Sequence, residues 1–149
     1  MAQTSTGING CDVAIWLDKA GGTLTDISGS SNKIDLNFDQ EIAMFRTFGS
    51  KWPKRLECGK DASFALDVIY TSAADEGLDI LKDWFFATDP GARTLKIYVP
   101  DKNVGSDVYS CEVRIENLTF SAEAGAADPI MVSASLLPDG EVTLVTNAT

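Results

Sequence analysis

One continuous stretch, residues 61–87, changes its hydrophobic period from that of a strand to that of a helix. In Asp61–Thr71 apolar side chains alternate with polar or small ones, which predicts a strand with one buried face. Beyond Ser72 the apolar residues recur at helical spacing. An isolated helix of this length is marginal in water, so its apolar stripe must be buried on a sheet. The stretch predicts a mainly β domain with one α-helix packed on the sheet, and a helix–sheet core of Leu78, Leu81, Trp84 and Phe85.

The predicted helix has recognisable ends. Ser72 is a candidate N-cap, with Asp75 three residues on approximating a capping box. Gly77 within the first turns costs about 1 kcal/mol relative to alanine. The helix is expected to end near Ala87, because Asp89-Pro90-Gly91 cannot continue it.

The rest of the chain predicts further strands separated by turn residues. Leu118 and Phe120 break the phase of the longest strand, which predicts a bulge near Glu116-Asn117. The last two strands, joined through Pro138–Glu141, predict a C-terminal hairpin. The predicted strands are Asp12–Leu17, Thr23–Ser28, Lys33–Asp39, Arg93–Val99, Asp107–Phe120, Ile130–Leu136 and Glu141–Val145.

Length and composition favour one folded domain. A chain of 149 residues fits a single domain, here residues 11–149, preceded by a small, polar stretch at 1–10 that predicts a flexible arm. No signal-peptide pattern opens the chain, and no apolar run approaches the length of a membrane span, so no membrane anchor is expected. The net charge of −10 argues against binding of polyanions through a basic surface.

The sequence offers no pattern for catalysis, cofactor binding or metal binding. Without histidine there is no imidazole base or ligand, and the three cysteines lack metal-site spacing. Asp35-x-Asn37-x-Asp39 opens like a calcium loop, but Arg46 occupies the twelfth position, where glutamate is required. The acidic residues are scattered, with no pair on a pocket-like segment. We therefore expect a protein that is not an enzyme, with no catalytic, cofactor-binding or metal-binding residue.

Residues 40–60 fit neither period and predict a long hairpin or loop with apolar groups near its tip. Long excursions in compact domains are usually functional, and exposed aromatics there suggest a partner surface. The alternative is that the aromatics fold back onto the domain's own core. The cations of the segment favour a loop surface over a nucleic-acid patch, given the acidic remainder. The candidate contact residues are Met44, Phe45, Phe48, Trp52, Lys54 and Arg55.

From Gly22 to Leu144 the order of these patterns resembles the tail tube (major tail) proteins of long-tailed bacteriophages. The resemblance lies in Thr23-Leu-Thr-Asp-Ile-Ser-Gly-Ser-Ser before Lys33–Phe38, and in Phe45-Arg-Thr-Phe-Gly before a long excursion. It continues through Gly59-Lys-Asp-Ala-Ser-Phe-Ala-Leu-Asp-Val-Ile-Tyr, the helix preceded by Ala-Ala-Asp-Glu-Gly, and Glu116-Asn-Leu-Thr-Phe.

The resemblance implies a β-sandwich or partial barrel flanked by one helix. Six copies would close a ring, and stacked rings would form a tube through which DNA passes without specific binding. The excursion at 41–60 and the arm at 1–10 would bridge subunits. The partners implied are copies of the chain itself and other tail proteins at the ends of the tube. The protein would be made in the bacterial host cytoplasm and reside in the virion tail.

A tube lining would need wet, charged strand faces that repel DNA. The alternative is that these faces are ordinary outer surface, and the residues favour neither. A second functional hypothesis is a β-sandwich binding module of the carbohydrate-binding or adhesin type, since aromatics at 51–60 suit a sugar as well as a subunit. The candidate lumen residues are Asp35, Asn37, Asp39, Glu112 and Glu116.

Overall fold

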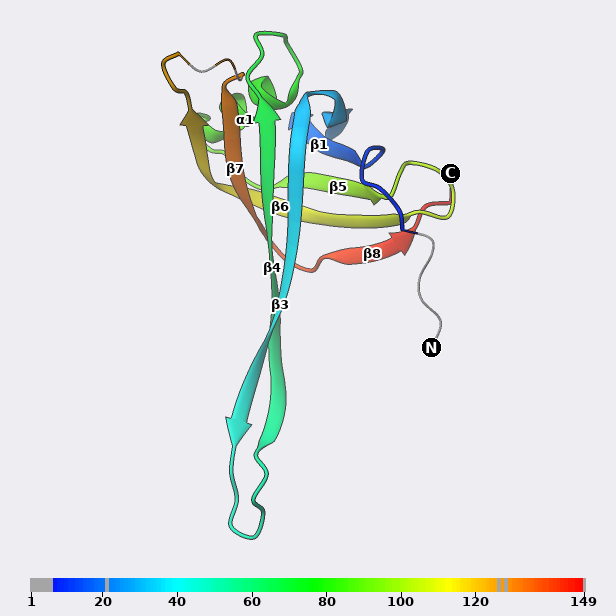
Figure 1. Cartoon of the computed structure of the whole chain (residues 1–149), viewed down its shortest axis with the longest axis vertical. Coiled ribbons are helices and arrows are strands. Elements are labelled where there is room, and N and C mark those ends of the chain that lie inside the picture. The colour runs from blue at the N-terminus through cyan, green and yellow to red at the C-terminus, as the bar shows by residue number, and fades with distance from the viewer. Residues whose placement is uncertain (1–6, 21, 126, 128, 149) are drawn as a thin grey trace.

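The computed structural model describes residues 7–20, 22–125, 127 and 129–148 (Figure 1). Over these residues, the strands form one antiparallel sheet in the order β2-β1-β5-β6-β7-β4-β3, and β8 pairs with β6. The predicted mainly β fold with one helix on the sheet is confirmed. The strands are β1 Ala14–Ala20, β2 Thr23–Asp26, β3 Ser31–Phe45, β4 Lys54–Ile69, β5 Arg93–Val99, β6 Asp107–Ser121, β7 Met131–Pro138 and β8 Thr143–Thr146; the helix α1 is Gly77–Phe85, and Ser28–Ser30 forms a 3₁₀ turn.

The sheet curls so that its two halves face each other across the core. In Figure 1, β5 and β8 run across the direction of β3, β4 and β7, and the long β6 joins the two halves. Alternation along each strand sends one set of apolar side chains inward. Because the sheet curls around these side chains, the domain is a partial barrel. The core includes Ile15, Leu17 and Leu95 from one half and Phe64, Leu66, Val132 and Leu136 from the other.

Helix α1 packs its apolar stripe into this core. Leu78, Leu81 and Trp84 are fully buried, and the Trp84 indole N–H donates to the Gly91 carbonyl. Ile80, which the stripe did not include, is buried too. Phe85 is only partly buried and packs edge-on against the exposed Phe86. Contrary to the prediction, it is therefore not part of the buried helix–sheet core.

The beginning of the helix differs from the prediction. The N-cap is Glu76 and not Ser72, and no side chain of the N-cap residue caps the helix. The Gly77 backbone N–H instead donates to the Ser30 hydroxyl at 2.9 Å, a buried contact 47 positions away in sequence. A Cβ on Gly77 would lie 3.0 Å from that Ser30 oxygen and 3.1 Å from a Val68 methyl carbon. A side chain here would crowd Ser30 and Val68, so glycine permits this close approach despite its poor helix propensity.

The predicted C-terminal hairpin is wrong. Strands β7 and β8 do not pair with each other; both lie along the same edge of β6, β7 beside its second half and β8 beside Asp107–Ser110. The connection at 139–142 is held to β6, since the Asp139 N–H donates to the Glu112 carbonyl at 2.7 Å. The long β6 thus provides one edge for both strands. The predicted bulge is confirmed, because the β6–β7 register shifts between Ile115 and Asn117.

Candidate assembly surfaces

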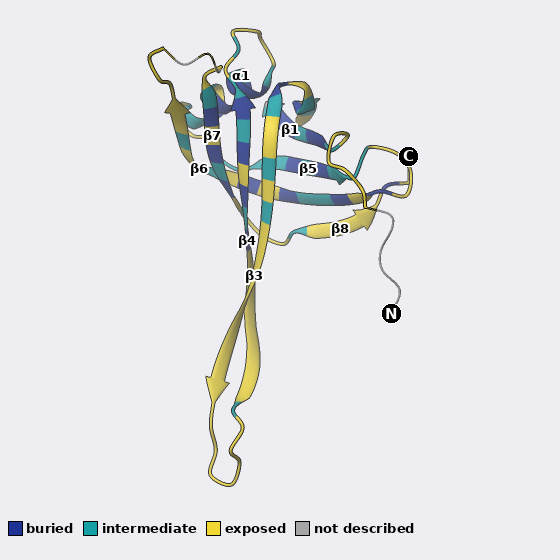
Figure 2. Cartoon of the chain, viewed as in Figure 1, coloured by how far each residue is buried: buried dark blue, intermediate teal, exposed yellow. Residues whose placement is uncertain are grey.

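Strands β3 and β4 continue beyond the domain as a projecting hairpin (Figure 1). Their ladder runs to the pair Phe45–Lys54, so the connecting turn spans only residues 46–53. We call residues 41–58 the distal hairpin. Every residue of it except Pro53 is exposed, as Figure 2 shows by its almost continuous yellow. Of the two forms predicted for this segment, a long hairpin or a loop, the structure has the hairpin.

The apolar side chains of the distal hairpin do not fold back onto the core. Phe48 is fully exposed, and Trp52 retains 82% of its accessible surface. Met44 and Phe45 keep 55% and 40%, and the basic Lys54 and Arg55 are exposed beside them. The candidate contact residues are therefore together at the far end of the molecule, and no described part of the chain covers them.

A second surface is the polar outer face of β3, β4, β7 and β6. Residues paired across an antiparallel ladder share a face, so Asp35 lies with Ala65 of β4, Ser135 of β7 and, beyond that, Asn117 of β6. Asn37 and Asp39 follow on the same face of β3. All three β3 candidates are exposed and point away from the core.

Strand β6 adds the two other lumen candidates. Glu112 precedes Arg114, which pairs with the outward-facing Leu137, so Glu112 shares the polar face with Asp35. Glu116 is exposed at the bulge and has no register partner on β7.

Asp39 lies directly opposite Asp61 in the β3–β4 ladder, a like-charge pair that disfavours the isolated hairpin. The face is acidic, with only Lys33 and Arg114 as cations, each paired to a carboxylate; its acids are Asp35, Asp39, Asp61, Asp67, Glu112 and Glu116.

The same four strands carry two long free edges. Among the described residues, β3 pairs only with β4, and the second half of β6 pairs only with β7. An unpaired edge exposes a row of backbone N–H and C=O groups that another strand can satisfy. No residue pattern in the sequence indicated these edges, because they follow from the order of strands in the sheet.

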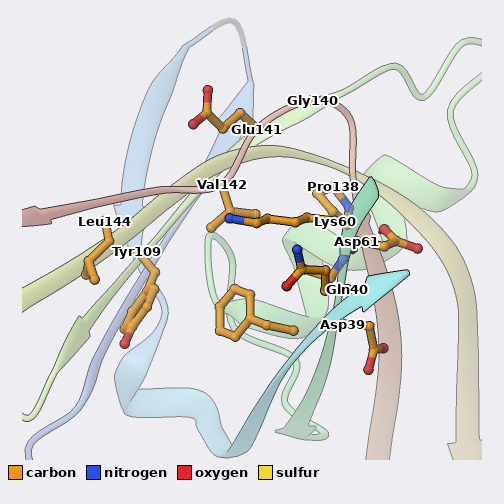
Figure 3. A pocket seen from close by; sticks show the side chains of 12 residues that line it. Asp39, Gln40, Lys60, Asp61, Tyr109, Pro138, Gly140, Glu141, Val142 and Leu144 are labelled. Atoms are coloured by element: carbon orange, nitrogen blue, oxygen red, sulfur yellow. Dashed lines mark hydrogen bonds between the residues drawn. The ribbon is translucent and has the colours of Figure 1, made fainter. Parts of the chain in front are cut away.

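An open groove of about 770 Å³ lies between the base of the hairpin and the connection from β7 to β8 (Figure 3). Phe38 and Tyr109 meet there with ring centroids 5.7 Å apart. Gln40 and Lys60 point into the groove, while the carboxylates of Asp39 and Asp61 point away from it. No pattern of residues indicated this groove, because its walls come from strands far apart in the chain.

The three cysteines differ in accessibility and so distinguish the folded chain from the unfolded one. Burial, with a smaller contribution from the Glu112 carboxylate, raises the pKa of the Cys111 thiol to about 11, whereas Cys11 and Cys58 are exposed. We expect maleimide at neutral pH to modify Cys11 and Cys58 rapidly and Cys111 only on unfolding, because the thiolate is the reactive form. Peptide mass spectrometry measures this; rapid modification of Cys111 in the folded monomer would contradict it.

Among the described residues, no three or more Cys, Asp or Glu side chains are placed together to hold a metal ion. No helix in this part of the chain has the length and apolar character that crossing a membrane requires. The features that stand out are therefore the distal hairpin, the acidic face, the free edges and the groove.

Several solved structures share this fold. A structure of the tail of an empty gene transfer agent particle, refined with C6 symmetry, matches with a TM-score of 0.71 and 15% identity over 93% of this chain and 99% of that one. The SPP1 tail tube matches with a TM-score of 0.71 and 15% identity, over 96% of this chain and 80% of that one. A chain of the anti-feeding prophage baseplate matches with a TM-score of 0.74 and 11% identity, over 97% of both chains.

The comparisons define the class by fold. No protein-family model and no curated protein sequence matches the chain. The resemblance to tail tube proteins is confirmed at the level of the fold, which is that of the tail tube. The structural neighbours come from a particle tail, a prophage baseplate and the sheath–tube complex of an extracellular contractile injection system.

Proposed function

We propose that this chain is a structural subunit that assembles with its own copies into rings, and that the rings stack into a tail tube for DNA. The observation that carries the proposal is the exposed distal hairpin, joined to a domain with the tail tube fold. A monomer that leaves Phe48 and Trp52 in water exposes the kind of patch that marks a protein interface. Sixfold rings agree with the C6 symmetry of one structural neighbour.

The free edges of β3 and β6 provide a way to close the ring. Across β6-β7-β4-β3 each strand is antiparallel to the next, so β3 runs opposite to β6. Rotation about a ring axis preserves the component of a strand's direction along that axis. The β3 edge of one copy therefore meets the β6 edge of the next in antiparallel orientation, and the sheet continues from copy to copy.

In this arrangement the acidic face would line the channel. Asp35, Asn37, Asp39, Glu112 and Glu116 would face the DNA, and their charge would keep the phosphate backbone from adhering. Six chains of −10 give 6 × −10 = −60 per ring. The DNA would slide past without base-specific contacts.

The remaining partners follow from the same proposal. The ends of the tube would bind other tail proteins; the structural neighbours include a sheath/tube terminator complex and a tube-terminating cap. The protein would be synthesised in the host cytoplasm and incorporated into the virion tail. Residues 11–149 would act as one domain. Of the proposed arm at 1–10, residues 1–6 lie outside the described residues, and residues 7–10 are exposed coil.

Electron microscopy of the purified protein tests the proposed function. We expect rings and hollow tubes as protein and salt concentrations rise, since salt screens repulsion between acidic subunits. Negative-stain images and sedimentation give the measurement. A protein that stays a monomer under all conditions would count against the proposal.

One observation favours carbohydrate binding as the second candidate function. The groove beside Phe38 and Tyr109 offers aromatic and polar groups to a sugar. A glycan array separates the two candidates. A saturable signal that Tyr109→Ala removes, from a protein that forms no rings, would support the binding module.

A further inference from the structure

The apolar layer of the domain is incompletely covered at two strands, β3 and the second half of β6. Each has one edge that no described strand pairs with. The inner strands β4 and β7 bury their core-facing side chains fully, as Phe64 and Val132 show. The core-facing side chains of the two outer strands are buried only in part or exposed, so a strand laid along either edge would extend their cover. These side chains are Ile34, Leu36 and Phe38 on β3 and Ile115, Leu118 and Phe120 on β6.

The two free edges have the same usable length. Strand β5 pairs with β6 only as far as Val113, so residues 114–121 are free on that side. Glu116 lies in the bulge and takes no ladder position of its own, which leaves 8 − 1 = 7 positions. On β3 the register is regular from Lys33 until the shift that follows Gln40. Residues 33–39 therefore offer seven positions as well.

We propose that the free edges of neighbouring copies pair in one register, with Asp39 of one copy opposite Arg114 of the next and Lys33 opposite Ser121. The inference rests on the proposed tube and specifies the residue contacts of the seam between its subunits. Every apolar side chain of the seam then faces an apolar one, and every polar side chain faces a polar one. The pairs between the two ends are Ile34–Phe120, Asp35–Thr119, Leu36–Leu118, Asn37–Asn117 and Phe38–Ile115.

Other registers bring unfavourable groups together. A slip of one residue would turn the apolar side chains of one strand onto the polar face of the other. A slip of two residues in one direction sets Asp35 beside Glu116, and a slip of two in the other direction sets Asp39 beside it. Each of these slips juxtaposes two carboxylates, which is destabilising. The proposed register instead places the neutral Asn37 at the bulge.

One end of the seam completes a charge arrangement that a single copy leaves unbalanced. Asp39 and Asp61 face each other in the β3–β4 ladder, and neither forms an ion pair with a described residue. Arg114 bonds Asp139 through Nε at 3.1 Å, and its two Nη nitrogens make no hydrogen bond to the described residues. Across the proposed seam this guanidinium lies beside Asp39 of the next copy. The neighbouring copy thus supplies the cation for the like-charge pair.

Two double-cysteine variants test the register directly. Asp35→Cys with Thr119→Cys puts two thiols opposite each other across the seam, whereas Asp35→Cys with Asn117→Cys is two positions out of register. Both variants also carry Cys11→Ser and Cys58→Ser, which removes the exposed native thiols. Within one copy β4 and β7 lie between the two positions, and three strand spacings, roughly 14 Å, are too far for a disulfide.

The two variants are expected to behave differently on oxidation after assembly. The variant at 35 and 119 should give a ladder of covalent multimers on a denaturing gel, and the variant at 35 and 117 should remain mostly monomeric. The reverse result would overturn the register. Normal tubes with no ladder from either variant would overturn the seam and leave the tube function intact. A wild type that forms neither rings nor tubes would overturn both.

An exchange of charges tests the Asp39–Arg114 contact without new thiols. Asp39→Arg and Arg114→Asp should each raise the protein concentration needed for tube formation by about fivefold or more, because like charges then meet across the seam. The double variant restores opposite charges and should assemble within about twofold of the wild type. Asp83→Arg, on the exposed side of α1, is the matched control and should change assembly little. All four variants are expected to melt like the wild type, since these side chains are exposed. A double variant as defective as either single one would contradict the contact.

Discussion

Removal of the distal hairpin is expected to give a folded protein that no longer builds tubes. The deletion replaces residues 41–59 by Asn-Gly, which joins the ladder pair Gln40–Lys60 through a two-residue turn. The excised segment is exposed, so the free energy of unfolding should change by less than about 1 kcal/mol. Assembly should be lost, because the deletion removes Ile42, Met44, Phe45, Phe48, Trp52 and Leu56, the large apolar side chains exposed there.

A shorter deletion serves as the matched control. Replacing only residues 46–53 by Asn-Gly closes the hairpin at the pair Phe45–Lys54 and keeps both apolar faces. Thermal melting and electron microscopy of the two variants show whether the strands or the tip make the contact. Normal tubes from the longer deletion would exclude the hairpin from assembly. Loss of folding in that variant would instead show that the hairpin stabilises the domain.

Much of the fold could be predicted from local periodicity. The strand at Arg93–Val99 has the predicted bounds, because its alternation is complete and its neighbours are loops. The part of β3 that packs against the core lies within the predicted strand Lys33–Asp39, but the strand continues to Phe45. Periodicity failed there because, beyond the bulge, both faces carry apolar residues and neither is buried in the monomer.

Long-range contacts set the features that the sequence did not predict. The first turn of α1 bonds to Ser30, so no local capping pattern could locate Gly77 as the first helical residue. Asp75 has a positive φ of 61°, and its N–H donates to the Asp79 carboxylate, which places this candidate capping residue outside the helix. The placement of β7 and β8 along β6 likewise depends on the length of β6.

The candidate assembly surfaces were predictable in part. The exposed aromatics and cations of residues 40–60 marked that segment as unusual on composition alone. Their two-faced arrangement required the register of β3 and β4. The acidic residues of the outer face could be assigned to one side of a strand, but the free edges beside them required the order of strands in the sheet.

Leu81→Asp is expected to destabilise the domain severely. Leu81 has no exposed surface and belongs to the core that α1 shares with the sheet. The substitution removes a buried leucine side chain and puts a carboxylate in its place. The described residues of the core cluster include no cation that could pair with this carboxylate. The expected loss is at least about 4 kcal/mol, a large part of the stability of an ordinary domain. Chemical denaturation or thermal melting measures it.

Two comparisons identify the cause of that loss. Leu81→Ala removes the packing without adding charge and should cost about 2–5 kcal/mol, whereas Asp83→Ala on the exposed side of the helix should change little. A buried carboxyl has a pKa above its unfolded value, so the folded aspartate variant binds more protons than the unfolded one. Its unfolding free energy, relative to wild type, should therefore fall as the pH rises from about 4 to about 7, while the alanine variant shows no such trend. Melting of the aspartate variant at the wild-type temperature would mean that the helix does not seal this core.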